Sequence, residues 1–345
     1  MLINRRAYSG MAATAIVAIV ASGSLAGCSA RATAAAGSPA KPIVITVDAV
    51  PASEEGGLYV ADYEGFFAQQ GLTVKIKPIT GGEAGIPDLQ SGKADLVAGN
   101  YVSFILAQMA GTFDGRPASM RIVAAGSELQ PGSEALYVMP DSRFKTVASL
   151  GKYHARVGLN TPNDVGDVMV GALLEDTGYA LRDIRQVIPG GGFPALLKML
   201  PAGKVDAIWL PEPLGTIAEQ EVGAVPLADF DQGSMQNFPF TGYIGTTQWV
   251  RTHAGTVAAF LRALAEGQEL ADTDREAVES AMEKYTGIAP LVADNMSIDS
   301  YPLTMDLPEL QRVPDSMFQY GLTPGAKSAY QIINMIQPEP GLIRG

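Results

Sequence analysis

The feature that most constrains this chain is a stretch that occurs twice. Residues 76–100 read IKPITGGEAGIPDLQSGKADLVAGN, and residues 184–211 read IRQVIPGGGFPALLKMLPAGKVDAIWLP. Each copy predicts an apolar strand, a glycine pair, a short helix and then Gly-Lys-x-Asp before a second apolar strand. An amphipathic helix ending at a glycine, Gly71 or Gly178, precedes each copy.

The distance between the copies is far longer than the roughly 20–50 residues of a solenoid repeat. The pattern therefore favours two similar α/β lobes, and 345 residues are enough for two domains. In open α/β sheets, ligands bind outside the carboxyl ends of the strands. Two such lobes that face each other would form a binding cleft.

The lobes are predicted to be discontinuous in sequence. Residues 42–136 and 242–345 are assigned to the first lobe, and residues 137–241 to the second. The first crossing between lobes is expected near residues 135–139, and the return crossing follows residue 243. Within the first lobe, an alternating apolar strand leads into a helix over residues 57–70, with Gly71 as its stop signal.

Residues 1–27 are predicted to form a lipoprotein signal peptide. Arg5 and Arg6 supply the basic region, a short apolar core follows, and Leu-Ala-Gly precedes Cys28. This resembles a bacterial lipobox, with cleavage before Cys28 and lipid attached to its thiol. Because Cys28 is the only cysteine, an internal disulfide is excluded. We expect an extracytoplasmic protein, anchored to the cell membrane through a flexible tether over residues 28–41; general secretory and twin-arginine export both remain open.

The charge balance argues against nucleic acid and anionic lipid surfaces as partners. The net charge is −12, and the predicted signal peptide contributes only basic residues, so the mature chain is more acidic still. His154 and His253 are the only histidines, and neither stands in a pattern with carboxylates or a cysteine cluster. Zinc-protease, serine-hydrolase and phosphate-loop motifs are absent. We therefore predict a monomeric binding protein without catalytic residues, metal or cofactor.

A resemblance to a known family adds to this interpretation. Residues 57–67 (GLYVADYEGFF), then Gly71-Leu72, Gly81-Gly82 and residues 91–95 (SGKAD) resemble the substrate-binding lipoproteins of ABC importers. The similarity is to the branch that serves sulfonates, taurine, nitrate and thiamine-precursor pyrimidines, and it covers about residues 42–287. It implies a type II periplasmic-binding-protein fold: two α/β lobes, two crossing strands and hinge closure around a small solute. It also implies an ABC permease as the membrane partner.

The candidate ligand contacts are the loops that begin helices at the facing strand ends. Those of the first lobe are Ser53, Glu54, Glu55, Gly81, Gly82, Glu83, Asn100 and Tyr101. Those of the crossings and the second lobe are Ser133, Glu134, Asn160, Thr161, Asn163, Gly191, Glu212 and Tyr243. Glycine pairs at helix starts can present backbone N–H groups to a ligand oxygen, although they also serve as simple turn formers. Asn160 and Thr161 fit a helix-capping role equally well.

The ligand chemistry follows from the charges in these loops. They contain several glutamates and no Arg or Lys, whereas a sulfonate or nitrate site usually needs a guanidinium or several converging donors. We therefore hypothesise an amine-bearing or pyrimidine-like heterocycle, with a sulfonate or similar small anion as the alternative. Two other functions stay open: an enzyme on the same fold, related to pyrimidine- or menaquinone-pathway enzymes, and a lipoprotein that presents its ligand to a membrane sensor.

Overall fold

The computed structural model describes residues 41–111, 120–323, 325–326, 328–336 and 343–344. The predicted signal peptide, the lipidation site Cys28 and the tether up to residue 40 lie outside the described residues. No helix within the described ranges combines the length and the apolar character needed to cross a bilayer.

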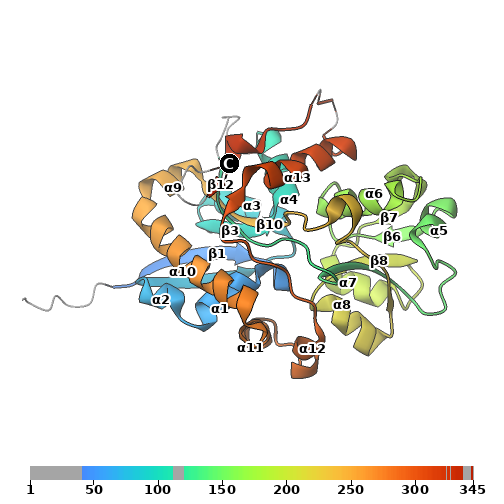
Figure 1. Ribbon diagram of the computed structural model, residues 1–345, viewed down its shortest axis with the longest axis horizontal. Coiled ribbons are helices and arrows are strands. Elements are labelled where there is room, and N and C mark those ends of the chain that lie inside the picture. The colour runs from blue at the N-terminus through green and yellow to red at the C-terminus, as the bar shows by residue number, and fades with distance from the viewer. Residues whose placement is uncertain (1–40, 112–119, 324, 327, 337–342, 345) are drawn as a thin grey trace, which may run out of the picture. The chain divides into compact units, whose positions relative to one another are not determined.

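Two five-stranded sheets form the framework, and both follow the same strand order (Figure 1). The first sheet runs β2 (Leu72–Pro78), β1 (Ile43–Ala49), β3 (Leu96–Asn100), β10 (Thr241–Thr246), β4 (Met120–Ala125). The second runs β7 (Arg185–Val187), β6 (Arg156–Gly158), β8 (Ala207–Pro211), β5 (Glu134–Val138), β9 (Val225–Asp229). The first three strands of each sheet are parallel, and the fourth is antiparallel to both of its neighbours. The predicted duplication is therefore a duplication of sheet topology.

Each sheet takes its fourth strand from the chain that has just crossed from the other sheet. β5 enters the second sheet after the first crossing, and β10 returns to the first sheet after β9. The crossing segments pair with each other, because Leu129 N–H donates to the Phe238 carbonyl at 3.0 Å and Phe240 N–H donates to Ser127 at 2.9 Å. A third segment joins them, since Glu128 N–H donates to the Ser300 carbonyl at 2.9 Å. This arrangement is a two-lobed type II periplasmic-binding-protein fold with two crossings. The crossings precede β5 and β10, whereas the sequence predicted them within or after these segments.

The structure explains the repeated Gly-Lys-x-Asp. Gly92 and Gly203 have φ angles of 71° and 63°, a left-handed conformation that glycine adopts without steric cost. Three residues later the aspartates play equivalent parts. Asp95 Oδ2 accepts the Thr46 N–H of β1 at 2.8 Å, and Asp206 Oδ2 accepts the Arg156 N–H of β6 at the same distance. The glycine thus turns the chain, at the end of the helix Gly82–Ser91 in the first copy and shortly after the helix Gly192–Met199 in the second. The aspartate fixes the start of the next strand against its neighbour.

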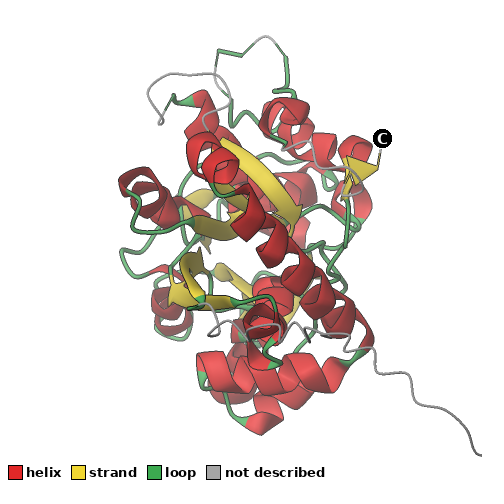
Figure 2. Cartoon of the chain, turned by 90° about the vertical axis from the view of Figure 1, so that its left-hand side faces the viewer, coloured by secondary structure: helices red, strands yellow, loops and turns green. Residues whose placement is uncertain are grey.

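Helices cover both faces of the sheets (Figure 2). The first sheet is flanked by α1 (Gly56–Tyr63), α2 (Phe66–Gln69), α3 (Gly82–Ser91), α4 (Tyr101–Met109), α9 (Thr247–Thr252), α10 (Ala254–Thr273) and α11 (Arg275–Thr286). The second has α5 (Val147–Lys152), α6 (Val165–Glu175), α7 (Gly192–Met199) and α8 (Leu214–Ile217), followed by a π-helical turn over Ala218–Val222. Leu96 and Ala98 pack under α1 and α10, whereas Val97 between them packs under α3 and α4. Central strands buried on both faces read as continuous apolar runs.

The C-terminal part connects the crossings with both sheets. It contains α12 (Pro290–Asn295), α13 (Leu307–Gln319) and the small parallel pair β11 (Met305–Asp306) and β12 (Ile343–Arg344). Arg312 of α13 donates to the carbonyls of Ser234, Gln236 and Asn237, just ahead of the return crossing. The Tyr320 hydroxyl donates to Glu175 of α6 at 3.1 Å.

Two expectations need revision at the level of elements. The helix predicted over 57–70 is interrupted, because Gly65 has φ 76° and separates α1 from α2. Tyr63, the last residue of α1, is 42% exposed. The predicted lobe boundary at 136/137 falls inside β5, which pairs with the second sheet from Glu134 onward. We propose that the lobes divide at the crossing segments, residues 126–133 and 230–240.

Candidate functional site

The loops at the carboxyl ends of the parallel strands meet where the two lobes face each other. Ser53 N–H, after β1, donates to the Glu212 carbonyl after β8 at 2.9 Å. The Thr161 hydroxyl, after β6, donates to Glu83 of α3 at 2.9 Å. Asn100 Nδ2, at the end of β3, donates to Asp164 Oδ2 at 3.2 Å. These hydrogen bonds join the lobes directly, as does the bond from the Ser103 hydroxyl to Asp164 Oδ1 at 2.8 Å, and the described arrangement is closed.

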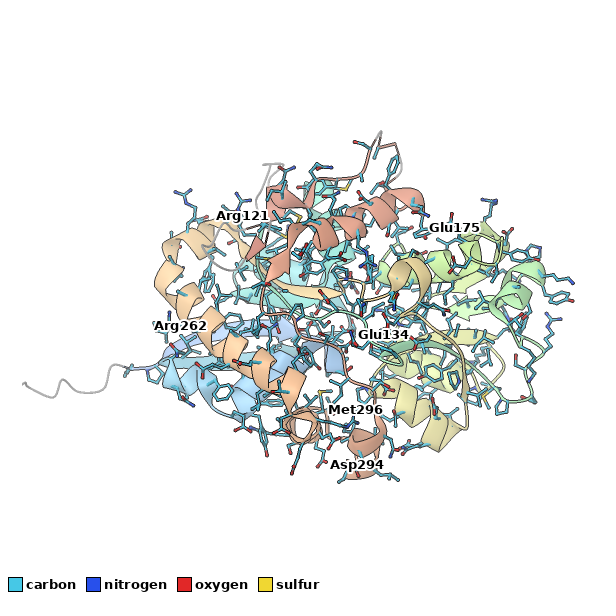
Figure 3. All side chains as sticks on the ribbon, in the orientation of Figure 1. Arg121, Glu134, Glu175, Arg262, Asp294 and Met296 are labelled. Atoms are coloured by element: carbon cyan, nitrogen blue, oxygen red, sulfur yellow. The ribbon has the colours of Figure 1, made fainter. Side chains whose placement is uncertain are left out.

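Buried carboxyl groups gather at this junction. We call Glu54, Glu55, Glu134, Asp164 and Asp299 the acidic cluster; each is at most 7% exposed. Glu54 is central, because its charge interacts with those of the other four. Glu134 lies in the interior of the molecule in Figure 3, whereas the labelled Arg121 and Arg262 lie far from it. Among the described residues, the buried polar and charged side chains include no lysine or arginine.

Burial without a cation raises the pKa of every member of the cluster. Loss of hydration is the largest cause throughout, and neighbouring acids add to it for Glu54, Glu55, Glu134 and Asp164. The pKa rises to about 8 for Glu54, about 7 for Asp164 and about 6 for Asp299. For Glu55 and Glu134 it lies well above the usual range. At neutral pH the closed form therefore retains protons on Glu54, Glu55 and Glu134, whereas Asp164 is about half protonated and Asp299 is largely ionised.

Part of the cluster is held by fixed donors. The Ser53 hydroxyl donates to Asp299 Oδ2 at 2.8 Å, and the Ser103 hydroxyl of α4 donates to Asp164 Oδ1 at 2.8 Å. Trp209 Nε1 donates to Glu134. These bonds fix the positions of the carboxyl groups, and they leave the remaining oxygens free to accept further donors.

Several buried acceptors at the junction make no well-formed hydrogen bond within the protein: both carboxylate oxygens of Glu55, Glu134 Oε1, Asp299 Oδ1, Glu83 Oε2 and the side-chain oxygen of Asn160. Tyr243, Glu54 and Ser133 lie within reach of Glu55, Glu134 and Asp299, respectively, and influence their pKa values. An unsatisfied buried polar group costs about 1–3 kcal/mol, so such groups are rare and point to a missing partner. A molecule rich in N–H donors would supply that partner.

Some predicted contacts are engaged elsewhere. The two carboxylate oxygens of Glu212 accept the Thr216 N–H at 3.1 Å and the Thr216 hydroxyl at 3.0 Å, so this side chain caps α8. Burial raises its pKa to about 7. Gly82 packs against Gly99, where an added Cβ would lie 2.7 Å from the Gly82 Cα. The close approach of the backbones at Gly82 and Gly99 is therefore sufficient to explain why glycine stands at these positions.

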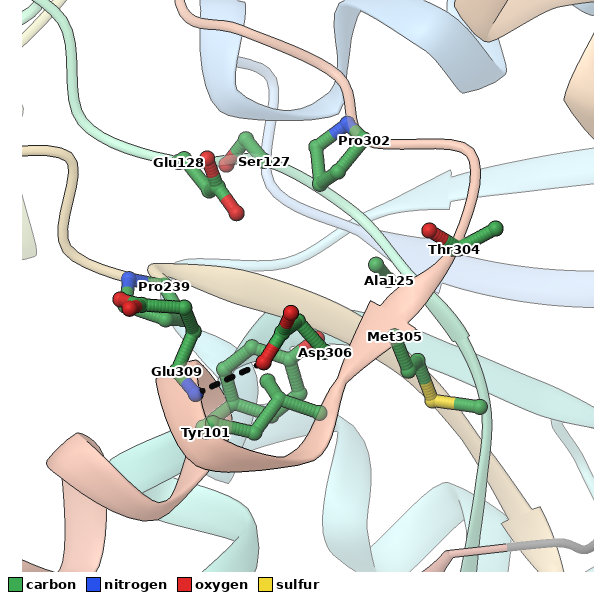
Figure 4. Close-up of a pocket in the computed structure, with 11 residues that line it drawn as sticks. Tyr101, Ala125, Ser127, Glu128, Pro239, Pro302, Thr304, Met305, Asp306 and Glu309 are labelled. Atoms are coloured by element: carbon green, nitrogen blue, oxygen red, sulfur yellow. Dashed lines mark hydrogen bonds between the residues drawn. The ribbon is translucent and has the colours of Figure 1, made fainter. Parts of the chain in front are cut away.

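Tyr101 turns toward the crossing segments. It lines a small cavity of about 10 Å³ together with Ser127, Glu128 and Glu309 (Figure 4). Its buried hydroxyl has no hydrogen-bond partner. A cavity of this size is about large enough for one water molecule. We therefore place Tyr101 at the crossing segments, where burial is the main cause of the raised pKa of its hydroxyl, and near enough to Glu55 that the Glu55 charge contributes to that raised pKa.

The remaining predicted residues divide between the interior and the surface. Ser133 is fully buried, and its carbonyl accepts the Glu212 N–H at 3.0 Å. Tyr243 lies in the core beside Glu55 and packs against Phe260, with ring centroids 5.8 Å apart. Gly81 is buried, whereas Asn163 and Gly191 are exposed. The structure thus joins Ser53, Glu54, Glu55, Glu83, Asn100, Ser133, Asn160 and Thr161 around one junction.

Two members of the cluster escaped the sequence reasoning. Asp164 is the N-cap residue of α6, and an acid at a helix start indicates a local role at the helix end and says nothing about burial. Asp299 stands in a proline-rich C-terminal stretch without a helix or strand pattern. The sequence carried no usable signal for Asp299, because it reaches Ser53 across 246 residues.

The described residues contain no group of three or more His, Cys, Asp or Glu side chains arranged to hold a metal ion.

Comparisons with known proteins agree with the fold. The alkanesulfonate-binding protein SsuA from Xanthomonas axonopodis pv. citri, bound to MOPS, is 18% identical with a TM-score of 0.71, covering 86% of this chain and 98% of its own. The nitrate-binding protein NrtA from Synechocystis PCC 6803 is 14% identical with a TM-score of 0.68, covering 83% and 84%. A cysteine-to-serine mutant of DSZB in complex with biphenyl-2-sulfinic acid is 15% identical with a TM-score of 0.59, covering 86% and 96%.

No curated protein matches the chain. The family model described as NMT1/THI5 like matches residues 53–277, which span both lobes and all but one member of the acidic cluster. This match covers well over half of the sequence. The chain belongs to the NMT1/THI5-like family.

Proposed function

We propose that this protein is the extracytoplasmic solute-binding component of an ABC importer. It captures a small polar molecule between its two lobes and delivers it to a membrane permease. The fold and the family support a solute-binding role, and two of the structural neighbours are periplasmic proteins that bind a sulfonate or nitrate. Acylation of Cys28 would anchor the monomer at the outer face of the cell membrane.

The solute is an amine-bearing, donor-rich molecule, such as an aminopyrimidine. The observation that carries this assignment is the acidic cluster with its unpartnered oxygens and, among the described residues, no buried lysine or arginine. A sulfonate or nitrate would find no guanidinium here, and its charge would oppose ionisation of the buried carboxyl groups. A cationic or N–H-rich solute replaces the retained protons and pairs with the free acceptors.

Closure supplies the mechanism. The solute touches both lobes only when the cleft is closed, so its binding free energy shifts the open–closed equilibrium toward the closed form. The bonds Ser53–Glu212, Thr161–Glu83 and Asn100–Asp164 already join the lobes and define that form. The permease would recognise the closed form.

We favour binding over catalysis because the polar groups of the site include no nucleophile activated by a histidine. His154 Nδ1 lies 3.0 Å from the Asp183 carbonyl, and His253 stacks on Trp249. The only cysteine, Cys28, belongs to the predicted lipidation signal. The alternatives, an enzyme on this fold or a lipoprotein serving a membrane sensor, predict turnover of the solute or a neighbouring histidine-kinase gene instead of a permease and an ATPase.

A thermal-shift screen tests the proposal directly, because a ligand raises stability by RT ln(1 + [L]/Kd). The panel would contain aminopyrimidines and primary amines on one side, and taurine, alkanesulfonates and nitrate on the other. Stabilisation by the first group alone is expected. Tight binding of taurine or nitrate without any response to amines or pyrimidines would refute the assigned chemistry.

A further inference from the structure

A chamber lies between the lobes, lined by residues that adjoin Ser53, Glu54 and Glu212 in the sequence. Its volume is about 410 Å³. Residues 50–52 and 78–80, which follow or end β1 and β2, line it from the first lobe. The second lobe contributes residues 193–194 and several residues between 211 and 217, and the end of α11 contributes residues 285, 286 and 288. We call this chamber the apolar vestibule. Its size falls in the range of small-molecule sites, roughly 300–1,000 Å³.

The lining of the vestibule is apolar on both sides. Ile79 faces it from the first lobe, Phe193, Leu214 and Ile217 from the second, and Ile288 from the segment after α11. No charged residue is among the described residues that line it. Of the lining hydroxyls, Tyr285 donates to Asp62 and Thr286 donates to the Met282 carbonyl. The vestibule therefore offers apolar surface and few free polar groups.

Residues that wall the vestibule are sequence neighbours of residues with buried acceptors. Ala52 precedes Ser53 and Glu54, and Thr80 is three residues from Glu83, whose Oε2 has no partner. Pro211 and Pro213 flank Glu212, the residue whose carbonyl binds Ser53. An apolar chamber and a set of buried acceptors thus share the same loops.

We propose that the solute is a monoamine with an aryl or alkyl body: the ammonium group binds among the acceptors, and the apolar body fills the vestibule. This inference rests on the proposed function, which it narrows from donor-rich solutes in general to amphiphilic amines. A fully hydrophilic amine would leave the apolar walls in contact with water. An apolar body removes that surface from water and gains affinity in proportion to the area covered.

Three probes of matched length test the two halves separately. 4-Phenylbutylamine carries both features, 1,4-diaminobutane replaces the phenyl group by a second ammonium, and 4-phenylbutyrate keeps the phenyl group but reverses the charge. Isothermal titration at pH 7.5 should show 4-phenylbutylamine binding at least about tenfold more tightly than 1,4-diaminobutane, because the ring is buried. 4-Phenylbutyrate should not bind.

Variants locate the effect in the vestibule. Leu214→Trp fills part of the chamber and Ile79→Asn makes its wall polar; each should weaken 4-phenylbutylamine at least about fivefold and leave 1,4-diaminobutane within twofold. Ile188→Trp, at an exposed isoleucine of the second lobe outside the lining, is the matched control. Two variants with different chemistry guard against a folding defect in either one, and thermal unfolding of each checks this.

The outcomes separate this inference from the proposed function. If 1,4-diaminobutane binds as tightly as 4-phenylbutylamine, or if the vestibule variants behave like Ile188→Trp, the inference is wrong and the amine site stands. If 4-phenylbutyrate binds and neither amine does, the proposed amine chemistry is wrong as well. Absence of binding by all three probes also overturns the inference.

Discussion

The retained protons of the acidic cluster make a strong prediction about stability and pH. A carboxyl group whose folded pKa exceeds its unfolded value stabilises the fold below the unfolded pKa, and this contribution is lost as pH rises through the folded pKa. The pKa of Glu54 rises from 4.5 to about 8, that of Asp164 from 3.8 to about 7, and that of Asp299 from 3.8 to about 6. We therefore expect the ligand-free protein to lose stability between pH 5.5 and 7.5.

The magnitude follows from the number of protons. Each group that is protonated when folded and ionised when unfolded contributes about −1.4 kcal/mol per pH unit to the free energy of unfolding. Near pH 6.5, Glu54 alone gives a slope of about that size, and Asp164 and Glu212 add to it. Glu54→Gln is a near-isosteric substitution that cannot ionise, so it should reduce the slope by about one proton.

Urea denaturation of the ligand-free protein at half-unit steps from pH 5.5 to 8.5 gives the slope for both proteins. Glu64→Gln is a matched control, because Glu64 is an exposed glutamate just after α1. The reasoning is refuted if the free energy of unfolding is flat or rises with pH in this window, as is usual for carboxylates paired with cations. It is also refuted if Glu54→Gln leaves the slope unchanged.

Three further predictions concern single residues. Gly99→Ala brings a methyl group to 2.7 Å from the Gly82 backbone and should cost about 1–3 kcal/mol in urea denaturation; an unchanged midpoint would contradict the close packing of α3 on β3. Asp95→Ala removes the acceptor of the Thr46 N–H and should cost about 1–2 kcal/mol, whereas no loss would mean that the repeated aspartate has no structural part. Tyr101→Phe deletes a buried hydroxyl without a partner, so we expect thermal unfolding to show unchanged or slightly raised stability; a loss above about 1 kcal/mol would reveal a bound water.

The local features of the fold could be read from the sequence because they depend on neighbours along the chain. Gly92 ends α3 and Gly203 lies in the turn after α7, each through its own φ angle, and Leu96 to Ala98 are apolar because the strand is covered on both faces. The helix break at Gly65 was missed, because the apolar pattern continues across it and a glycine within a helix pattern gives an ambiguous signal. The lobe boundary predicted at 136/137 falls inside β5, because β5 follows the crossing without a change in composition.

The sequence by itself determined that this chain is a duplicated α/β protein whose strand ends carry acids rather than bases. Only the tertiary structure decided which of those acids act together. Glu54, Glu134, Asp164 and Asp299 come from four distant segments, and their burial, and hence their raised pKa, exists only once the lobes meet. Glu212 is a buried glutamate like Glu54 and Glu134, but the N–H and hydroxyl groups of Thr216 donate to its two carboxylate oxygens. The identity of a residue can be read from the sequence, whereas its burial and its hydrogen-bond partners depend on which distant segments the fold places next to it.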